Sequence, residues 1–262
     1  MKKSILSIVA ASTLLTSVAN ADFLGVEIGG AGWAPEMTGK FQYGSGTPTN
    51  MDLEDNLGYG DTESSTFYWL SFEHPVPVIP NIKIIQTNLE MDASKTNTAS
   101  ISFSGQTYSA SEAIATSMTL NQTDYILYYE LSEGIIIPFV HLDVGLAIKN
   151  LDGKISLTSN SVGSYEKDFS VPVPMAYGKI KLSTSAIPFF PFDIEYETLR
   201  LSVGDNSFED TKYGLVYNVE LAAGFDVGAV AGIRKESLEV DESSVKANID
   251  IDGYYFGAYF NW

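Results

Sequence analysis

The stretch Asn248–Trp262, NIDIDGYYFGAYFNW, decides the fold class. Its second half alternates strictly, with aromatic or Ala side chains at even positions and Gly, Tyr or Asn at odd positions. A period of two indicates a β-strand, and so apolar a face is typical of a strand that contacts lipid, because on a water-soluble protein it would promote aggregation. The apolar face consists of Tyr254, Phe256, Ala258, Phe260 and Trp262. We expect this face to be the signal that barrel-insertion machinery reads during assembly.

Nine segments upstream alternate in the same way, and each approaches the ~9–11 residues that a tilted strand needs to cross a bilayer. They are 24–29, 68–73, 81–91, 124–131, 139–149, 176–183, 190–197, 212–221 and 227–234. No second apolar run approaches the ~20 residues of a membrane helix, and only helices and closed barrels satisfy every backbone polar group in lipid. The ten segments therefore predict an all-β, transmembrane, antiparallel up-and-down β-barrel. A soluble β-sandwich is the alternative architecture.

Two details qualify the expected count of ten strands. The segment Thr98–Tyr108 also alternates, so a twelve-stranded barrel is the alternative, with this segment extending above the membrane as a hairpin. Within 81–91 the alternation slips at Ile84-Ile85, which we interpret as a β-bulge.

The connections between the ten segments fall into two classes of length. The tight or Pro-rich links, which we expect to be periplasmic turns, are 74–80, 132–137, 186–188 and 222–225. The longer polar links, which we expect to be extracellular loops, are 35–63, 92–118, 151–169, 204–210 and 241–246. This two-class pattern favours the barrel, because an even number of strands places both termini on the periplasmic side.

The N-terminal segment has the pattern of a secretory signal peptide. A basic start is followed by an apolar run and by Ala19-Asn20-Ala21, an A-x-A cleavage site before Asp22. We therefore expect residues 1–21 to be removed and residues 22–262 to form the barrel. Export together with the barrel pattern predicts the outer membrane of a Gram-negative bacterium.

Composition narrows the classes of function. The chain of 262 residues has 15 Lys and Arg against 33 Asp and Glu, a net charge of -18, which excludes a nonspecific nucleic-acid binder. The absence of Cys excludes disulfides, thiolate metal sites and a Cys nucleophile. Charged residues make up 18% of the chain, below the ~25% of ordinary soluble domains.

The faces opposite the apolar ones carry the charges that we expect to line the lumen. They are Glu27, Glu73, Lys83, Asp124, Glu130, His141, Asp143, Lys149, Lys179, Lys181, Asp193, Glu195, Glu197, Glu220 and Arg234. Small barrels fill their interior with side chains, and a buried charge is costly unless it is paired. We therefore expect a charge-paired plug or a very narrow channel, with an ion- or solute-selective pore as the alternative.

Catalytic and metal sites are not expected. The pair His141 and Asp143 would share the inner face of one strand near the periplasm, but no Gly-x-Ser-x-Gly motif accompanies it and no His falls in an expected outer loop. The segment Asn248–Gly253 opens like a calcium loop, yet position twelve of that motif would be Tyr259 rather than Glu. We expect no catalytic residue, metal or cofactor.

Several motifs resemble an uncharacterised family of Gram-negative outer-membrane β-barrel proteins, found mainly in marine-type gammaproteobacteria. The resemblance covers essentially the whole chain after the signal peptide. Its marks are Asp52–Gly58, Phe72–Lys83, Leu127–Glu130, Leu142–Gly145, Leu151–Gly153 and Asp252–Tyr255. Lys83, where Arg is expected, and Trp262, where Phe is commoner, depart from the family pattern. The resemblance implies a barrel and its location, and it supplies no catalytic residues.

Together these observations predict a monomeric, porin-like integral membrane protein of the cell envelope. Its role would be structural, or it would allow passive passage of small solutes or ions. The expected partners are outer-membrane lipid, lipopolysaccharide and the insertion machinery, with no nucleic acid. A surface binding or adhesion module acting through acidic loops is the second hypothesis, and a membrane-embedded hydrolase is the third.

Overall fold

A computed structural model describes residues 24–44, 48–76, 78–131, 139–184, 190–222, 224–242 and 245–262. The expected signal peptide and the links 132–137 and 186–188 lie outside these residues. The strands, the hairpin and one π-helical turn are β1 (Gly25–Tyr43), β2 (Met51–Asp52), η1 (Leu53–Leu57), β3 (Ser65–Glu73), β4 (Asn81–Thr96), β5 (Ile101–Phe103), β6 (Gln106–Tyr108), β7 (Ala113–Glu130), β8 (Val140–Ser159), β9 (Gly163–Leu182), β10 (Asp193–Val203), β11 (Asn206–Ala222), β12 (Phe225–Glu242) and β13 (Val245–Asn261).

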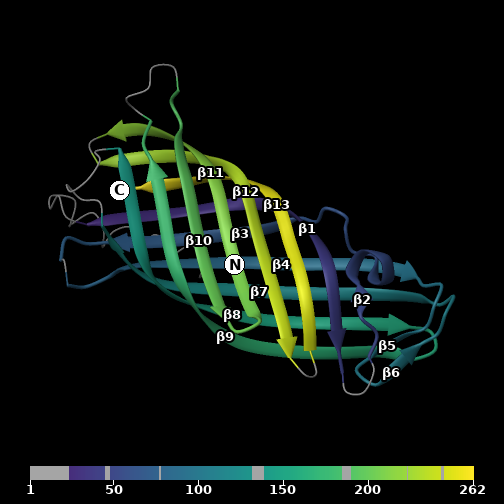
Figure 1. Ribbon diagram of the computed structural model, residues 1–262. Helices are drawn as coiled ribbons and strands as arrows, with labels where there is room; N and C mark the ends of the chain where they lie inside the picture. The colour runs from purple at the N-terminus through teal and green to yellow at the C-terminus, as the bar shows by residue number, and fades with distance from the viewer. Residues whose placement is uncertain are drawn as a thin grey trace, which may run out of the picture.

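Ten long strands form a closed antiparallel barrel (Figure 1). Each long strand pairs with the next long strand in the chain. Between β1 and β3 the short β2 pairs with β1 alone, and between β4 and β7 the β5–β6 hairpin forms a separate small sheet. Pairing of β1 with β13 closes the barrel, from Glu27 opposite Asn261 to Tyr43 opposite Val245. The expected ten-stranded architecture is thereby confirmed, and the twelve-stranded alternative is wrong.

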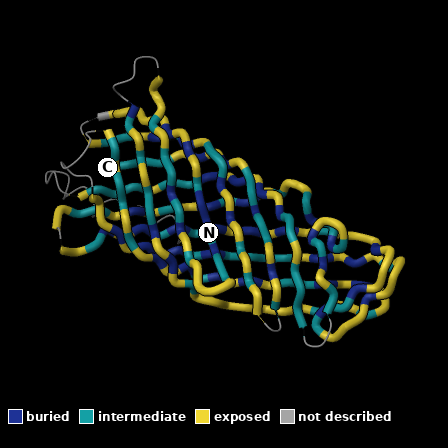
Figure 2. The backbone as a smooth tube through the Cα atoms, viewed as in Figure 1, coloured by how far each residue is buried: buried dark blue, intermediate teal, exposed yellow. Residues whose placement is uncertain are grey.

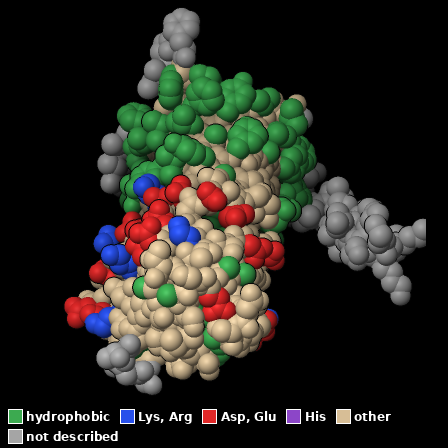
Figure 3. Space-filling view, turned by 90° about the vertical axis from the view of Figure 1, so that its right-hand side faces the viewer, with side chains coloured by type: hydrophobic (Ala, Val, Ile, Leu, Met, Phe, Trp, Pro, Cys, Tyr) green, Lys and Arg blue, Asp and Glu red, His purple; other side chains and the backbone are tan. Residues whose placement is uncertain are grey.

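An apolar belt surrounds one half of the barrel, the half in which β1 begins and β13 ends; we call this the terminal half and the other the distal half. Large apolar side chains on the outer face of all ten strands are exposed there. The belt contains Ile28, Tyr68, Leu70, Phe72, Ile82, Tyr125, Leu127, Tyr129, Val144, Leu146, Ile148, Ile180, Leu182, Ile194, Tyr213, Leu215, Tyr217, Val219, Leu221, Val227, Tyr254 and Phe256. Figure 3 shows hydrophobic side chains over this half and acidic ones over the distal half.

The distal half reverses the polarity of the two faces. Its outer face is polar, whereas inward side chains such as Met37, Leu89, Ile114 and Leu157 are buried in an apolar core. Figure 2 shows the alternation of buried and exposed positions continuing along these strands beyond the belt. The distal half is therefore built like a water-soluble barrel, and the terminal half has the opposite pattern.

All five expected extracellular loops contain strand residues, which corrects their boundaries. β1 continues through Pro35 to Tyr43, β4 and β7 extend to Thr96 and from Ala113, and β8 and β9 continue to Ser159 and from Gly163. The link 204–210 reduces to a tight turn between Val203 and Asn206. These segments were expected to be loops because their outer faces are polar, and water rather than lipid contacts them.

Two other expectations need correction. β4 pairs with β3 and β7 without any shift in register, so there is no bulge at Ile84-Ile85. Ile85 is on the inner face and is 1% exposed. Because it is apolar and follows the apolar Ile84, the alternation in the sequence suggested a shift of one residue that the strand does not have. The second is the twelve-stranded alternative: Thr98–Tyr108 does form a hairpin, β5–β6, but the hairpin is a separate two-stranded sheet in which Ile101, Phe103 and Tyr108 are buried.

Segments inside the distal half close that end of the barrel. Met51, Leu53 and Leu57, from β2 and η1, are buried in the distal core together with the β5–β6 hairpin. The Asp52 carboxylate accepts hydrogen bonds from the first turn of η1, and Gly58 ends the turn at a φ of 86°, a conformation that suits glycine. No helix among the described residues is long and apolar enough to span a bilayer.

Candidate functional site: the charged lumen of the terminal half

Ten charged side chains cross the lumen in two layers, which we call the septum. The distal layer contains Asp124, Lys149, Asp210, Arg234 and Glu236, and the proximal layer contains Lys83, Lys179, Glu195, Glu197 and Lys212. The distal layer has two cations and three carboxylates, and the proximal layer has three cations and two carboxylates. The formal charges of the layers, -1 and +1, therefore cancel across the septum.

Arg234 on β12 organises the distal layer. Its guanidinium contacts Asp210 at 2.8 Å and Glu236 at 2.7 Å, and it donates a hydrogen bond to the Thr87 hydroxyl at 2.9 Å. The guanidinium also lies 4.8 Å from the centre of the Trp33 ring. Thr87 is on β4, so this one side chain connects opposite walls of the barrel.

Lys149 on β8 completes the same layer. Its ammonium contacts Asp124 and Asp210 at 2.9 Å each and donates to the Gln122 amide oxygen at 2.8 Å. The Gln122 amide nitrogen in turn donates to Glu236 at 2.7 Å. Lys149 is 0% exposed, so every one of its hydrogen bonds must come from protein groups.

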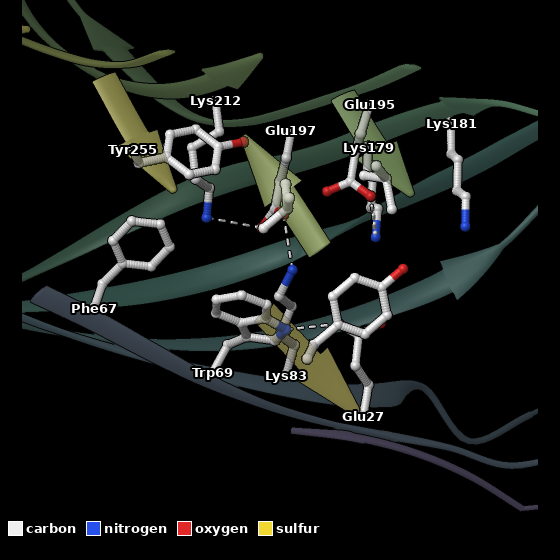
Figure 4. A pocket seen from close by; sticks show the side chains of 13 residues that line it. Glu27, Phe67, Trp69, Lys83, Lys179, Lys181, Glu195, Glu197, Lys212 and Tyr255 are labelled. Carbon is white, nitrogen blue, oxygen red and sulfur yellow. Dashed lines mark hydrogen bonds and ion pairs between the residues drawn. The ribbon is translucent and has the colours of Figure 1, made fainter. Parts of the chain in front are cut away.

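Glu197 is the centre of the proximal layer (Figure 4). Lys83 from β4 reaches it at 2.8 Å, and Lys212 from β11 reaches it at 3.4 Å. Lys179 pairs with Glu195 at 3.1 Å beside them. Because Lys83 and Glu197 belong to strands on opposite sides of the ring, this pair also spans the lumen.

A small cavity adjoins the proximal layer. Its volume is about 50 Å³, and its walls include Trp69, Tyr255, Tyr259, Lys181 and Glu195 (Figure 4). Such a space holds a few water molecules but excludes a sugar or a nucleoside. The Trp69 indole donates to Glu27 at 2.7 Å at this level.

The structure brings together nine of the fifteen charged residues named from the sequence. They are Lys83 with Glu197, Lys179 with Glu195, Lys181 with Asp193 at 3.5 Å, Asp124 with Lys149, and Arg234 with carboxylates that the sequence analysis omitted.

The remaining six residues lie nearer the terminal mouth. Glu27 accepts from Trp69, Glu73 accepts from the Tyr128 hydroxyl at 2.6 Å, and Glu130 accepts from Asn81 at 3.5 Å. Asp143 is opposite Lys179 in the sheet register. His141 and Glu220 are exposed at the ends of their strands. None of these six residues, including His141, belongs to the septum.

The sequence analysis missed Asp210, Lys212, Glu236, Gln122 and Thr87. Asp210 and Glu236 follow the inward phase of their strands beyond the ends that were predicted for them. Continuing the even positions from Lys212 back to Asp210, and from Arg234 on to Glu236, would have found both carboxylates. Among the described residues, no group of three or more His, Asp or Glu side chains is arranged to hold a metal ion.

Comparison with known proteins gives structural similarity only. No family model matches the chain, and no curated protein matches it. The outer membrane protease OmpT of Escherichia coli is 9% identical, with 93% of this chain and 97% of that chain covered and a TM-score of 0.38. The translocator domain of the autotransporter NalP of Neisseria meningitidis is 14% identical, with 98% and 97% covered and a TM-score of 0.42.

A third solved structure is Ail, the attachment invasion locus protein of Yersinia pestis. It is 9% identical, with 91% of this chain and 99% of that chain covered and a TM-score of 0.33. At these identities and TM-scores the three proteins assign neither an activity nor a ligand to this chain.

Proposed function

We propose that the chain is an integral outer-membrane β-barrel with a closed lumen, and that its role in the cell envelope is structural. The apolar belt supports the membrane placement. A continuous ring of exposed Tyr, Phe, Leu, Ile and Val on all ten strands far exceeds the few hundred Å² of apolar patch that a soluble monomer exposes. Lipid stabilises such a ring, whereas water would not.

The septum is the observation that supports a closed lumen. Its two layers connect opposite strands at the level of the belt, and side chains such as Lys149 and Arg234 have no exposed surface. Opening the barrel to solutes would require several of these ion pairs to separate inside a low-dielectric wall, which is costly because each charge would lose its partner. The distal core forms a second closure above the septum.

Planar-bilayer recording of the purified protein tests the closed lumen. We expect no defined single-channel steps from wild-type protein whose insertion is verified by heat-modifiable gel mobility. Defined steps whose size or ion selectivity changes in Glu195→Gln or Lys181→Ala would refute closure and support passive passage. Lys235→Ala is the matched control, because Lys235 is an exposed outer-face residue that pairs with Asp252.

Surface binding by the distal half is the second candidate function. The strands continue well beyond the belt, and Asp and Glu side chains are scattered over this extension among uncharged residues and a few Lys and Arg (Figure 3). Charge reversal at Glu239 and Asp241 is a suitable test, because both side chains are exposed. Deleting the loop from Gly44 to Asp61 is not suitable, because it would remove the buried residues Met51, Leu53 and Leu57.

A hydrolase would need a measured activity that is lost in His141→Ala. The His141 side chain is exposed, its cross-strand neighbour is Lys181 of β9, and it lies away from the septum. We therefore do not assign a catalytic role to it.

A further inference from the structure

A groove is present on the outer wall of the barrel, beyond the apolar belt. It has a volume of about 520 Å³ and lies across β7, β8 and β9. Six polar side chains line it in two rows set by the strand register: Thr119, Lys154 and Asp168 in one, and Asn121, Asp152 and Ser170 in the other. Gly153 and the ring of Phe169, which are opposite each other in the register, complete the lining and make part of it apolar. We call it the distal groove.

The distal groove is continuous with the belt. Tyr125 of β7 and Ile148 of β8 form one cross-strand pair at the edge of the belt. The next outward pair is Thr123 with Asn150, and the pair after that is Asn121 with Asp152, which lines the groove. A lipid whose acyl chains lie against the belt therefore has its headgroup on the side of the belt where this groove lies.

The distance from the belt to the groove determines which lipid headgroups can reach it. Asp152 is four residues beyond Ile148, which is about 14 Å along a strand and about 10 Å along the membrane normal at the usual barrel tilt. The headgroup region of a bilayer is only about 5–8 Å thick on each side. A glycerophospholipid headgroup therefore ends below the groove, whereas a headgroup of several sugars extends to it.

The chemistry of the lining also suits sugars. Two carboxylates, one amide and two hydroxyls offer both acceptors and donors for the hydroxyl groups of a saccharide. Lys154 is already paired with Glu166 at 2.8 Å, so the lining offers little positive charge to a phosphate. Asp152 forms no ion pair among the described residues, which leaves both of its oxygens to accept hydroxyl donors.

We propose that the distal groove binds the saccharide headgroup of an outer-leaflet glycolipid. The proposal rests on the membrane placement proposed above. The lipid's hydroxyls would be held by Asp152, Asn121 and Ser170, with its acyl chains packed along Ile148 and Tyr125. The groove lies on the outer wall directly beyond the belt, which favours a lipid anchored at the belt over a soluble oligosaccharide.

Native mass spectrometry of the detergent-solubilised full chain with purified lipopolysaccharide tests this site. We expect wild-type protein to bind, and the double variant Asp152→Ala/Asn121→Ala to raise the dissociation constant at least tenfold. Asp250→Ala is the matched control, because Asp250 is an outward acid of β13 four residues from the belt residue Tyr254. The control should change the dissociation constant less than twofold.

Three outcomes would overturn the glycolipid site. They are equal binding by all variants or none by the wild type, equal binding of phosphatidylglycerol, and binding of the free core oligosaccharide as tight as that of the whole lipid. Heat-modifiable mobility is measured on each sample first. A wild-type chain that fails to insert contradicts the membrane proposal itself, whereas an inserted barrel without selective binding contradicts only the groove.

Discussion

The two arginines of the chain have very different surroundings. Arg234 is surrounded by Asp210, Glu236 and the Trp33 ring, and it has no exposed surface. The chain's other arginine, Arg200, is on the outer face with its side chain 66% exposed, and it lies 3.7 Å from Glu209. The ion pairs of Arg234 should therefore contribute far more to the stability of the folded barrel than the ion pair of Arg200.

Replacing Arg234 should destabilise the folded barrel strongly. Arg234→Met leaves the buried Glu236 without its cation and leaves Asp210 with Lys149 alone. We expect this to cost about 3–5 kcal/mol, whereas Arg200→Met should cost less than about 1 kcal/mol. Adding Glu236→Gln to Arg234→Met returns the distal layer to its original formal charge and should recover part of the loss. Denaturant unfolding in micelles measures all three variants, and equal losses for the two single variants would contradict the role of the septum.

The hydrogen bonds between Glu112 and Ser161 should make the local stability of the distal loops depend on pH. Hydrogen bonds from the Ser161 hydroxyl and amide lower the pKa of the Glu112 carboxyl below its usual range. A lowered folded-state pKa means that the contact is fully present above the ordinary Glu pKa of about 4.3 and is lost as the pH falls through the lowered value. The protection factor of the Ser161 amide, which corrects the exchange rate for its intrinsic dependence on pH, should therefore fall only at acidic pH. Glu112→Gln should remove that dependence.

At the scale of the strand, the outward face of β8 changes from apolar to polar along the strand. β8 presents Val144, Leu146 and Ile148 outward in the terminal half, but its outward residues beyond Asn150 are polar and its inward Leu157 is buried. Alternation alone therefore identifies a strand, and the polarity of the outward face shows whether lipid or water contacts it.

A charge on the outer face of β8 should be costly only within the belt. Val144→Arg places a guanidinium near the middle of the belt and should cost about 2–4 kcal/mol, while Ser156→Arg on the distal part of the same face should cost under about 0.5 kcal/mol. Unfolding in lipid vesicles measures both. Similar costs for the two substitutions would show that the belt does not contact hydrocarbon.

β9 shows why several strand segments were expected to be loops. It pairs with β10 only from Ala176 to Leu182, so Gly163–Met175 has β8 as its single partner. Pro172 and Pro174 lie in this one-sided stretch, where a missing backbone donor leaves no ladder bond unmade. The link 151–169 was expected to be a loop because it is polar, and only the pairing of β9 with β8 shows that it is largely strand.

At the scale of the whole molecule, closure depends on the seam between β1 and β13. Val26 and Trp262 exchange backbone hydrogen bonds of 2.7 and 3.0 Å at the end of this seam. The Phe260 and Trp262 rings lie 5.9 and 6.5 Å from the Phe225 ring of β12. The last residues therefore join three strands.

Phe260→Asp should prevent assembly, because it places a charge on the apolar face of the closing strand and removes one ring from this cluster. We expect the variant to stay in the periplasm and to lose heat-modifiable gel mobility. Asn248→Asp, on the outward distal part of the same strand, is the control and should insert normally. Normal mobility of Phe260→Asp would contradict the expected assembly signal.

The sequence by itself determined the strand period, the ten belt segments and the inward phase of the charged residues, because these are local properties of alternating side chains. It did not determine the septum, the reversal of polarity in the distal half or the inward position of the β5–β6 hairpin. Contacts such as Lys83 with Glu197 and Gln122 with Glu236 join residues more than a hundred positions apart. Only closure of the barrel brings them together, since the register of each strand against its neighbours sets which inward side chains meet.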